Sequence, residues 1–248
     1  MESKFKLPTE TVELPSKGFI YPESSPLSKG TVEMKYMTAK EEDILTNQNY
    51  IKDGTVLDRL LESLIVDKDI NYEDLIIGDK NAIMVAARVL GYGKDYTFEY
   101  KDKEVSVDLS KIEPNFLDES KYEKGKNLFE FTLPTTKAVI TYKLLTGKDE
   151  RLVKQEIKGL QKINKQADPK LSTRLKHMIQ SVDGDTNKSS VREFVDNYFL
   201  ARDSKAFRNH LNATQPNVDL TFDFEDDAGN VEENISIPIT ANFFWPDE

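Results

Sequence analysis

Apolar side chains recur at helical spacing between residues 55 and 65, and their broad face predicts a core helix. An earlier helix is signalled by Thr38 and Glu41, which form a capping box because each side chain can satisfy the other's unpaired backbone N–H. This pair predicts a helix that runs to about Asn49. The first third of the chain therefore contains at least two helices.

A further helix is expected from Asp79, a favourable N-cap, through Leu90. Apolar residues nearly surround this segment, which predicts that the helix is buried. Gly91 or Gly93 would end it, because glycine readily adopts the left-handed conformation that other residues avoid.

Alternation of apolar and polar residues predicts several short strands. They are residues 31–37, 96–100, 104–108, 127–133, 137–144, 218–225 and 231–239. The second and third form a hairpin, the next two suggest a small antiparallel sheet, and the last two form a C-terminal hairpin.

Helical spacing returns after residue 147. A helix over residues 148–164 is separated by Pro169 from a second helix. The apolar side chains of that second helix are Leu171, Leu175, Met178 and Ile179. Helices around residues 191–200 and 203–211 complete this region.

Prolines at positions 8, 15, 22 and 26 and glycines at 18 and 30 forbid a long helix in residues 6–29. We expect an extended, turn-rich arm there. Either the arm packs over the protein's own core, or Phe19, Ile20 and Tyr21 anchor it on a partner protein.

Phe243, Phe244 and Trp245 concentrate aromatic area near the end of the chain, where tails are normally polar and frayed. Either the tail folds back into the core of the protein, or these side chains form an anchor at an interface.

The order of these elements indicates an α+β fold with segregated parts. It comprises an N-terminal extended arm and helical unit, a small antiparallel β-sheet, a second helical region and a C-terminal β-hairpin. The corresponding segments are residues 1–37, 38–93, 94–146, 147–215 and 216–248.

The 44 acidic and 34 basic residues give a net charge of −10, so nucleic acid or an anionic membrane would repel the chain. The lysines form no evident cluster. Cysteine is absent, which excludes disulfides and cysteine metal sites. The N-terminus lacks the apolar core of a signal peptide, and no apolar run is long enough to span a membrane. We expect a soluble protein in the cytoplasm, with no nucleic-acid or membrane partner.

Catalytic chemistry finds little support in the sequence. His177 and His210 lie in different predicted helices without a nucleophile motif, so each is expected to be a surface or interface residue. Gly91 and Gly93 follow a helix instead of opening one, which is unfavourable for binding phosphate. No catalytic residue and no cofactor are expected.

The best metal candidate is the acidic stretch DGDTNKSSVRE, residues 183–193, which begins like an EF-hand loop. Its sixth position is Lys188, where a sharp turn needs glycine, and its twelfth is Phe194, where calcium needs a bidentate Glu. An ordinary polar turn between helices is favoured over a calcium site, and no metal ligand is expected.

Three runs resemble one family and cover most of the first hundred residues. They are LPSKGFIYPESSPLSKGTVEMKYMTAKEEDIL, GTVLDRLLESLI and LIIGDKNAIMVAARVLGYGKDYTFEY. These runs are similar to baseplate hub and hub-assembly proteins of T4-like contractile-tailed bacteriophages. The ending NISIPITANFFWPD is similar to the ending of such proteins.

The resemblance implies a non-enzymatic role in building the tail baseplate, as a hub subunit or as an assembly chaperone that leaves afterwards. The implied partners are other baseplate hub or tail proteins, with the tape-measure protein as one candidate. The implied location is the host cytoplasm during assembly and, for a subunit, the virion tail baseplate. The contact candidates remain the aromatic residues of the arm and the tail.

Many members of that family place paired cysteines in their β-hairpins as small zinc ribbons. Residues 98–107 and 222–233 contain none. Hydrophobic packing and side-chain pairing are therefore expected to hold these hairpins. Two other classes stay open: an acidic binding or regulatory protein unrelated to phage tails and, less favoured, a metal-dependent enzyme.

Overall fold

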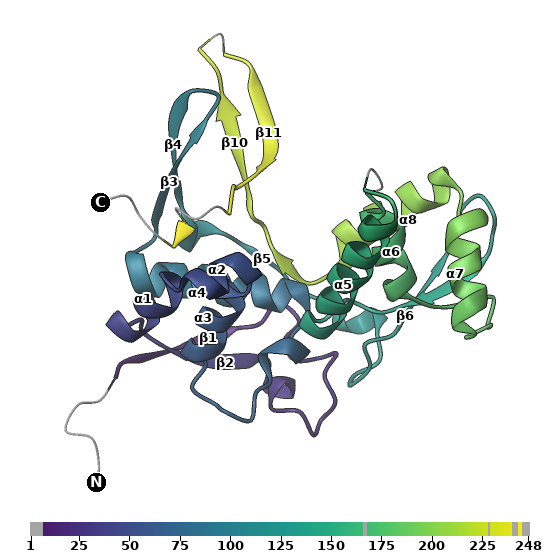
Figure 1. Ribbon diagram of the computed structural model, residues 1–248, viewed down its shortest axis with the longest axis horizontal. Coiled ribbons are helices and arrows are strands. Elements are labelled where there is room, and N and C mark those ends of the chain that lie inside the picture. Colours follow the sequence, from purple (N-terminus) through teal and green to yellow (C-terminus); the bar gives the residue numbers. More distant parts are fainter. Residues whose placement is uncertain (1–6, 166–167, 228, 240–242, 245–248) are drawn as a thin grey trace.

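The chain folds into two lobes, each with its own helices and short antiparallel strands (Figure 1). This computed structural model describes residues 7–165, 168–227, 229–239 and 243–244. One continuous hydrophobic core runs through both lobes. The expected α+β class is confirmed. None of the described helices is long and apolar enough to cross a membrane.

The N-terminal lobe packs helices against a two-stranded sheet. Thr38 and Glu41 form the predicted capping box. The helix that was expected to reach Asn49 is instead broken, because the Asn47 carboxamide accepts the backbone N–H groups of Asn49 and Tyr50 and starts a new helix. The elements of this lobe are β1 (Thr9–Glu13), β2 (Thr31–Lys35), α1 (Ala39–Leu45), α2 (Gln48–Asp53), α3 (Val56–Leu64) and α4 (Ile77–Tyr92).

Asp79 is not the N-cap of α4, because the helix begins two residues earlier and Asp79 is fully buried in its first turn. One carboxylate oxygen accepts the Ser16 N–H at 2.9 Å, and the other accepts the hydroxyls of Ser16 and Tyr21, each at 2.6 Å. The Tyr21 hydroxyl in turn accepts the Ile76 N–H at 3.0 Å. Burial raises the pKa of Asp79, although the bonds from Ser16 and Tyr21 oppose this. The arm is thereby fastened to the start of α4.

The arm between β1 and β2 is a loop that crosses itself, and a short 3-10 turn (Pro26–Lys29) precedes β2. The Leu14 N–H donates to the Gly30 carbonyl at 2.9 Å. Gly18 and Gly30 both have a φ of 74°, and a Cβ on Gly18 would lie 2.5 Å from the Gly30 nitrogen. Only glycine fits this crossing. It brings β1, a strand that the sequence did not predict, beside β2.

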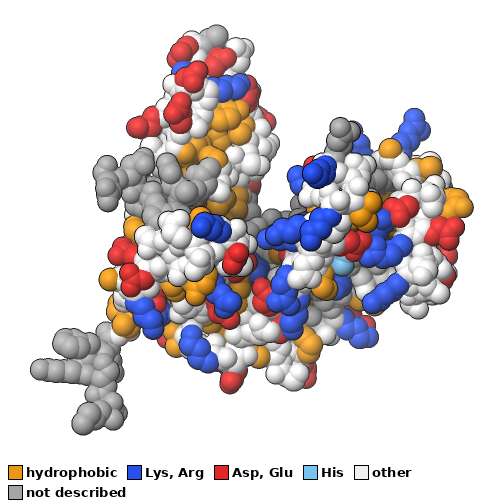
Figure 2. All heavy atoms as spheres, viewed as in Figure 1, with side chains coloured by type: hydrophobic (Ala, Val, Ile, Leu, Met, Phe, Trp, Pro, Cys, Tyr) orange, Lys and Arg blue, Asp and Glu red, His pale blue; other side chains and the backbone are white. Residues whose placement is uncertain are grey.

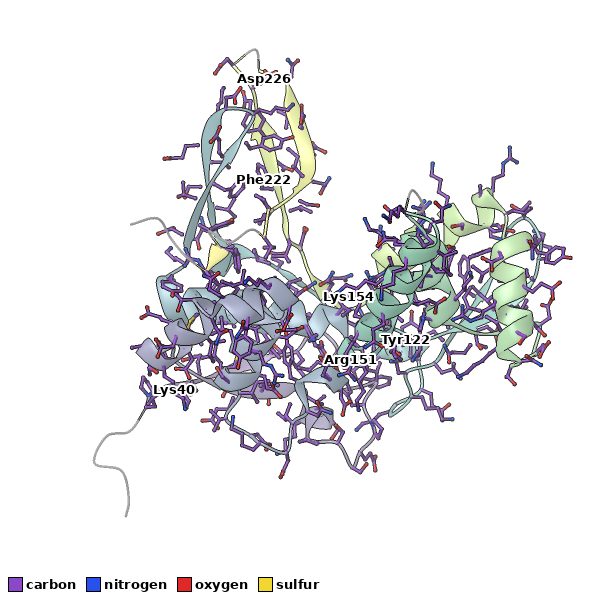
Figure 3. The ribbon with its side chains drawn as sticks, in the orientation of Figure 1. Lys40, Tyr122, Arg151, Lys154, Phe222 and Asp226 are labelled. Carbon is purple, nitrogen blue, oxygen red and sulfur yellow. The ribbon has the colours of Figure 1, made fainter. Side chains whose placement is uncertain are left out.

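Two hairpins from distant parts of the sequence stand side by side on this lobe (Figure 1). They are β3 (Asp95–Tyr100) with β4 (Lys103–Asp108), and β10 (Thr221–Glu225) with β11 (Val231–Ser236). Phe222 lies between them (Figure 3) and meets the rings of Phe98 and Tyr100 edge to face, with centroids 5.1 and 5.4 Å away. Lys101 pairs with Glu232, and Lys103 with Asp227. Hydrophobic packing and side-chain pairing hold the hairpins, as the sequence predicted.

The second lobe packs helices around a three-stranded antiparallel sheet. Its central strand β7 pairs with β6 on one side and β8 on the other. The elements are β6 (Phe129–Thr132), β7 (Val139–Tyr142), α5 (Gly147–Ile163), α6 (Lys170–Met178), β8 (Ile179–Val182), α7 (Lys188–Asn197) and α8 (Ala201–Thr214).

Two sequence predictions are corrected here. Ile179, expected in a helix, begins strand β8 directly after α6, because pairing with β7 outweighs the helical pattern. Residues 94–146 do not form one sheet, since β6 and β7 pair with β8 and leave the β3–β4 hairpin in the other lobe.

The lobes are joined by a short strand pair, β5 (Pro114–Asn115) with β9 (Asn217–Val218). The Asn81 side chain of α4 donates to the Asn217 side chain at 3.0 Å, which ties the N-terminal lobe to the returning chain. The remaining 3-10 turns are Tyr72–Asp74, Leu109–Lys111 and Glu119–Lys121.

Replacing Tyr21 with Phe should lower the free energy of unfolding by about 1–3 kcal/mol, because a buried carboxylate oxygen and the Ile76 N–H lose their shared partner. Urea unfolding followed by circular dichroism measures the change. Tyr198→Phe is the matched control, since Tyr198 is 58% exposed. Equal losses in the two variants would contradict the role given to the Tyr21 hydroxyl.

Phe222→Ala should release the β10–β11 hairpin from β3–β4, because one side chain fills the space between Phe98 and Tyr100. The expected cost is about 3–5 kcal/mol. Hydrogen exchange of the β10 and β11 amides should accelerate, whereas Val231→Ala, at an exposed position, should leave it unchanged. Unchanged protection in Phe222→Ala would show that other contacts hold the hairpins.

Candidate functional site

The arm residues that were predicted to contact a partner face the interior. Ile20 and Tyr21 are 1% and 6% exposed, and Phe19 packs, partly buried, against the same core. A side chain enclosed by its own core presents little surface to another protein. The partner-anchor prediction for the arm is therefore corrected, and the alternative, in which the arm packs over its own core, holds.

The tail shows the same arrangement. Phe243 and Phe244 are fully buried. Phe243 meets the Tyr96 ring edge to face at 4.9 Å and the Phe244 ring at 5.1 Å. Trp245 lies outside the described residues. For the two phenylalanines the interface-anchor prediction is corrected, because both are enclosed in the protein's own core and Phe243 packs on Tyr96 of β3.

Charge is divided unevenly between the two lobes. Residues 147–215 carry 14 Lys and Arg against 9 Asp and Glu, although the whole chain is acidic. The β10–β11 hairpin, residues 221–236, carries six Asp and Glu and no Lys or Arg. Figure 2 shows Lys and Arg gathered over the second lobe and Asp and Glu toward the tip of the hairpins, where Asp226 lies (Figure 3). The expectation of no basic cluster is therefore corrected.

A groove of about 370 Å³ lies between α6 and α8. Its lining residues recur three and four apart on each helix, so each set forms one helix face. The rim carries the cations Arg174, Lys205 and Arg208 and the amides Asn209, Asn212 and Gln215. The floor is apolar and consists of the buried Leu175, Met178 and Leu211, and the exposed Leu171 is also part of the apolar lining.

The groove keeps an excess of positive charge. Arg174 is held by Glu150 of α5 at 2.6 Å. Lys205 and Arg208 form no salt bridge with any carboxylate of the described residues, and no described Asp or Glu lines the groove. Lys154 and Lys158 of neighbouring α5 are exposed, and neither forms a salt bridge with a described residue; Figure 3 labels Lys154. The site suits an anionic ligand that also has apolar surface.

A partly buried cluster of charged side chains holds α6 against α5 and α7. Glu156 of α5 accepts two hydrogen bonds from the Arg192 guanidinium of α7, at 2.7 and 2.6 Å, and meets the His177 ring of α6 at 2.9 Å. Hydrogen bonding by Arg192, followed by that of His177, lowers the pKa of Glu156 to about 2. The three helices are thereby held together, and α6 presents Arg174 to the groove.

The second histidine faces the sheet instead of the groove. His210 of α8 stacks on the Phe131 ring at 4.5 Å and shares a 2.9 Å hydrogen bond with the Tyr142 hydroxyl. Burial lowers the pKa of His210, which favours the neutral ring at this aromatic contact. The two histidines thus take part in separate contacts. A surface or interface position was expected for each, and in the structure both are partly buried.

The acidic stretch that begins at Asp183 forms a polar turn between β8 and α7. The Asp183 carboxylate accepts the Val139 N–H at 2.7 Å, and Asp185 accepts the Asn187 N–H at 2.8 Å. Asn187 then caps α7. Its acidic side chains therefore hold the backbone of the turn, and within the described chain no three potential metal ligands come together.

The sequence did contain a signal for the groove. Counting charge by segment shows the basic excess of residues 147–215, and Lys205, Arg208 and Asn212 follow each other at helical spacing. Summing charge over the whole chain conceals both features. The local sequence pattern does not predict that α6 and α8 lie on opposite sides of one groove, because this arrangement depends on tertiary packing.

No family model matches the chain, and neither does any curated protein or solved structure. The geometry nevertheless defines a class of site: a cationic groove with an apolar floor. Such a groove can hold a segment that places carboxylates on the rim and apolar side chains against Leu171 and Met178.

Glu156 should make the second lobe sensitive to acid. Its pKa falls from 4.5 to about 2 on folding, so its contribution to stability is complete above about pH 4.5 and is lost as the pH falls toward 2. Glu156→Gln should therefore show a shallower fall in melting temperature over that range, measured by circular dichroism. Glu193→Gln, an exposed position on α7, is the control. Parallel curves for wild type and Glu156→Gln would contradict this coupling.

Proposed function

We propose that this chain is a non-enzymatic protein of a contractile phage tail, a baseplate hub subunit or hub-assembly factor, which holds an acidic segment of another hub or tail protein in the cationic groove. The groove between α6 and α8 is the observation that supports binding of an acidic segment. The resemblance of residues 14–45, 54–65, 75–100 and 234–247 to hub and hub-assembly proteins supports the baseplate part.

The chemistry of the groove favours a protein segment over nucleic acid. Outside residues 147–215 the chain carries 35 acidic and 20 basic residues, which would repel an extended polyanion. The groove lining contains no aromatic side chain on which bases could stack. Its floor is aliphatic and suits the apolar face of an acidic helix or extended segment.

The energetics require several contacts at once. An exposed ion pair contributes about 0–1 kcal/mol, so Lys205 and Arg208 alone would give weak binding. Burial of Leu171 beneath a partner adds apolar area, at about 25 cal/mol per Å². We therefore expect an amphipathic acidic partner whose association rate falls as salt is added.

Charge reversal at Lys205 and Arg208 tests the proposal. The Lys205→Glu/Arg208→Glu double variant, co-expressed with hub and tape-measure proteins, should capture its partner at least about tenfold less well. Lys40→Glu/Lys52→Glu changes the net charge equally on exposed positions of the N-terminal lobe, where Figure 3 labels Lys40, and should capture normally. Equal capture by both double variants would overturn the groove as the contact site.

Mass spectrometry of purified virions distinguishes a hub subunit from an assembly factor. Stoichiometric presence identifies a hub subunit, whereas absence together with loss of phage yield on deletion identifies an assembly factor. If the chain captures no tail protein and its gene has no tail genes beside it, the alternative of an acidic regulatory protein unrelated to phage tails takes precedence.

A further inference from the structure

Strand β1 is hydrogen-bonded to a neighbouring strand on one side only. Within the described chain its sheet contains β1 and β2 alone. Pro8 accepts the Tyr36 N–H, and the Leu14 N–H donates to Gly30, so the even-numbered residues of β1 bond toward β2. Because backbone groups alternate in direction along a strand, those of Thr11 and Glu13 point away from β2.

The open edge of β1 borders a groove of about 310 Å³. The other wall is a face of α4 with small and branched apolar side chains, among them Ala82, Val85 and Ala86. Ile112 and Val218 also line the groove. Thr11 and Glu13 make no backbone hydrogen bond to any described residue across it. An unpaired strand edge beside an apolar groove has the two components of a site for strand addition.

Charge identifies the kind of strand that fits. Glu10 and Glu13 stand on the rim, and both are exposed. Pairing of β1 with β1 of a second copy would bring these carboxylates close together, which is unfavourable. A strand that carries Lys or Arg would meet them with opposite charge.

We propose that β1 and α4 form a docking site for an extended, basic segment of a partner protein, which adds to β1 as a further strand. Its backbone bonds to Thr11 and Glu13, and its small apolar side chains cover Ala82 and Ala86. Because side chains alternate between the two faces of a strand, its basic side chains lie on the opposite face, beside Glu13. This surface is separate from the cationic groove of the second lobe and does not depend on the role proposed for that groove.

A capped heptapeptide in which Lys alternates with Val is the probe. It should slow hydrogen exchange of the Thr11 and Glu13 amides in the full chain, and the corresponding Glu–Val peptide should not. The Lys205→Glu/Arg208→Glu variant should bind the probe as the wild type does, which keeps this test distinct from that of the cationic groove.

Two variants remove separate components of the site. Thr11→Pro removes an N–H that points away from β2, a position where an edge strand tolerates proline. Ala86→Leu fills the groove from α4. Each should weaken binding of the probe at least about tenfold. Ala213→Leu, at an exposed position on α8, should not, and circular dichroism checks that every variant folds.

Three results would overturn the proposal. The probe could leave the Thr11 and Glu13 amides of the wild type unprotected at millimolar concentration, or bind the Thr11→Pro and Ala86→Leu variants undiminished. Light scattering could instead reveal a dimer that Thr11→Pro dissolves, which would assign the edge to a second copy of this chain.

Discussion

A buried carboxylate fixes the course of the N-terminal arm. Asp79 accepts three hydrogen bonds from Ser16 and Tyr21, which lie 63 and 58 residues earlier in the chain. A lone buried carboxylate is costly, so these donors stabilise the folded arrangement in which Asp79 is enclosed. The same bonds hold the loop that lays β1 along α4. The open strand edge and the apolar groove beside it are consequences of this attachment.

Acidic residues at the third position of a helix serve two purposes in this protein. Glu41 and Asp149 bond back to the threonines that cap their own helices. Asp79 and Asp203 follow Ile76 and Leu200, which have no capping oxygen, and they bond distant segments instead. Asp203 accepts the backbone N–H groups of Thr135 and Thr136, at 2.7 and 3.0 Å. An acidic residue at the third position of a helix thus either caps its own helix or bonds a distant segment. Which of the two occurs depends on whether the N-cap residue, three places earlier, has a side-chain oxygen.

The two lobes differ in the charge that they expose, and this difference bears on how the protein could work. The hairpins carry carboxylates around an aromatic cluster centred on Phe222. The second lobe exposes Lys and Arg side chains (Figure 2), and those of α5 and α8 include Lys154, Lys158, Lys205 and Arg208, which form no salt bridge with a described residue. Salt bridges such as that of Arg174 with Glu150 neutralise only part of this charge. A molecule with separated charged surfaces is suited to orienting partners, because opposite charge steers each toward one face.

Local signals in the sequence determined much of the secondary structure: the Thr38–Glu41 capping box, the apolar face of α3 and the hairpin around Lys101 need only neighbouring residues. Strand β8 and the β5–β9 pair were missed, since each exists only where a distant strand meets it. The candidate site was missed for the same reason. For the arm and the tail the sequence left open whether the aromatic side chains pack on the core or contact a partner, and the core encloses Tyr21, Phe243 and Phe244. The sequence specifies which side chains are apolar or charged. Whether a side chain is buried, and which way it points, depends on the segments that pack against it, and only the tertiary structure determines those contacts.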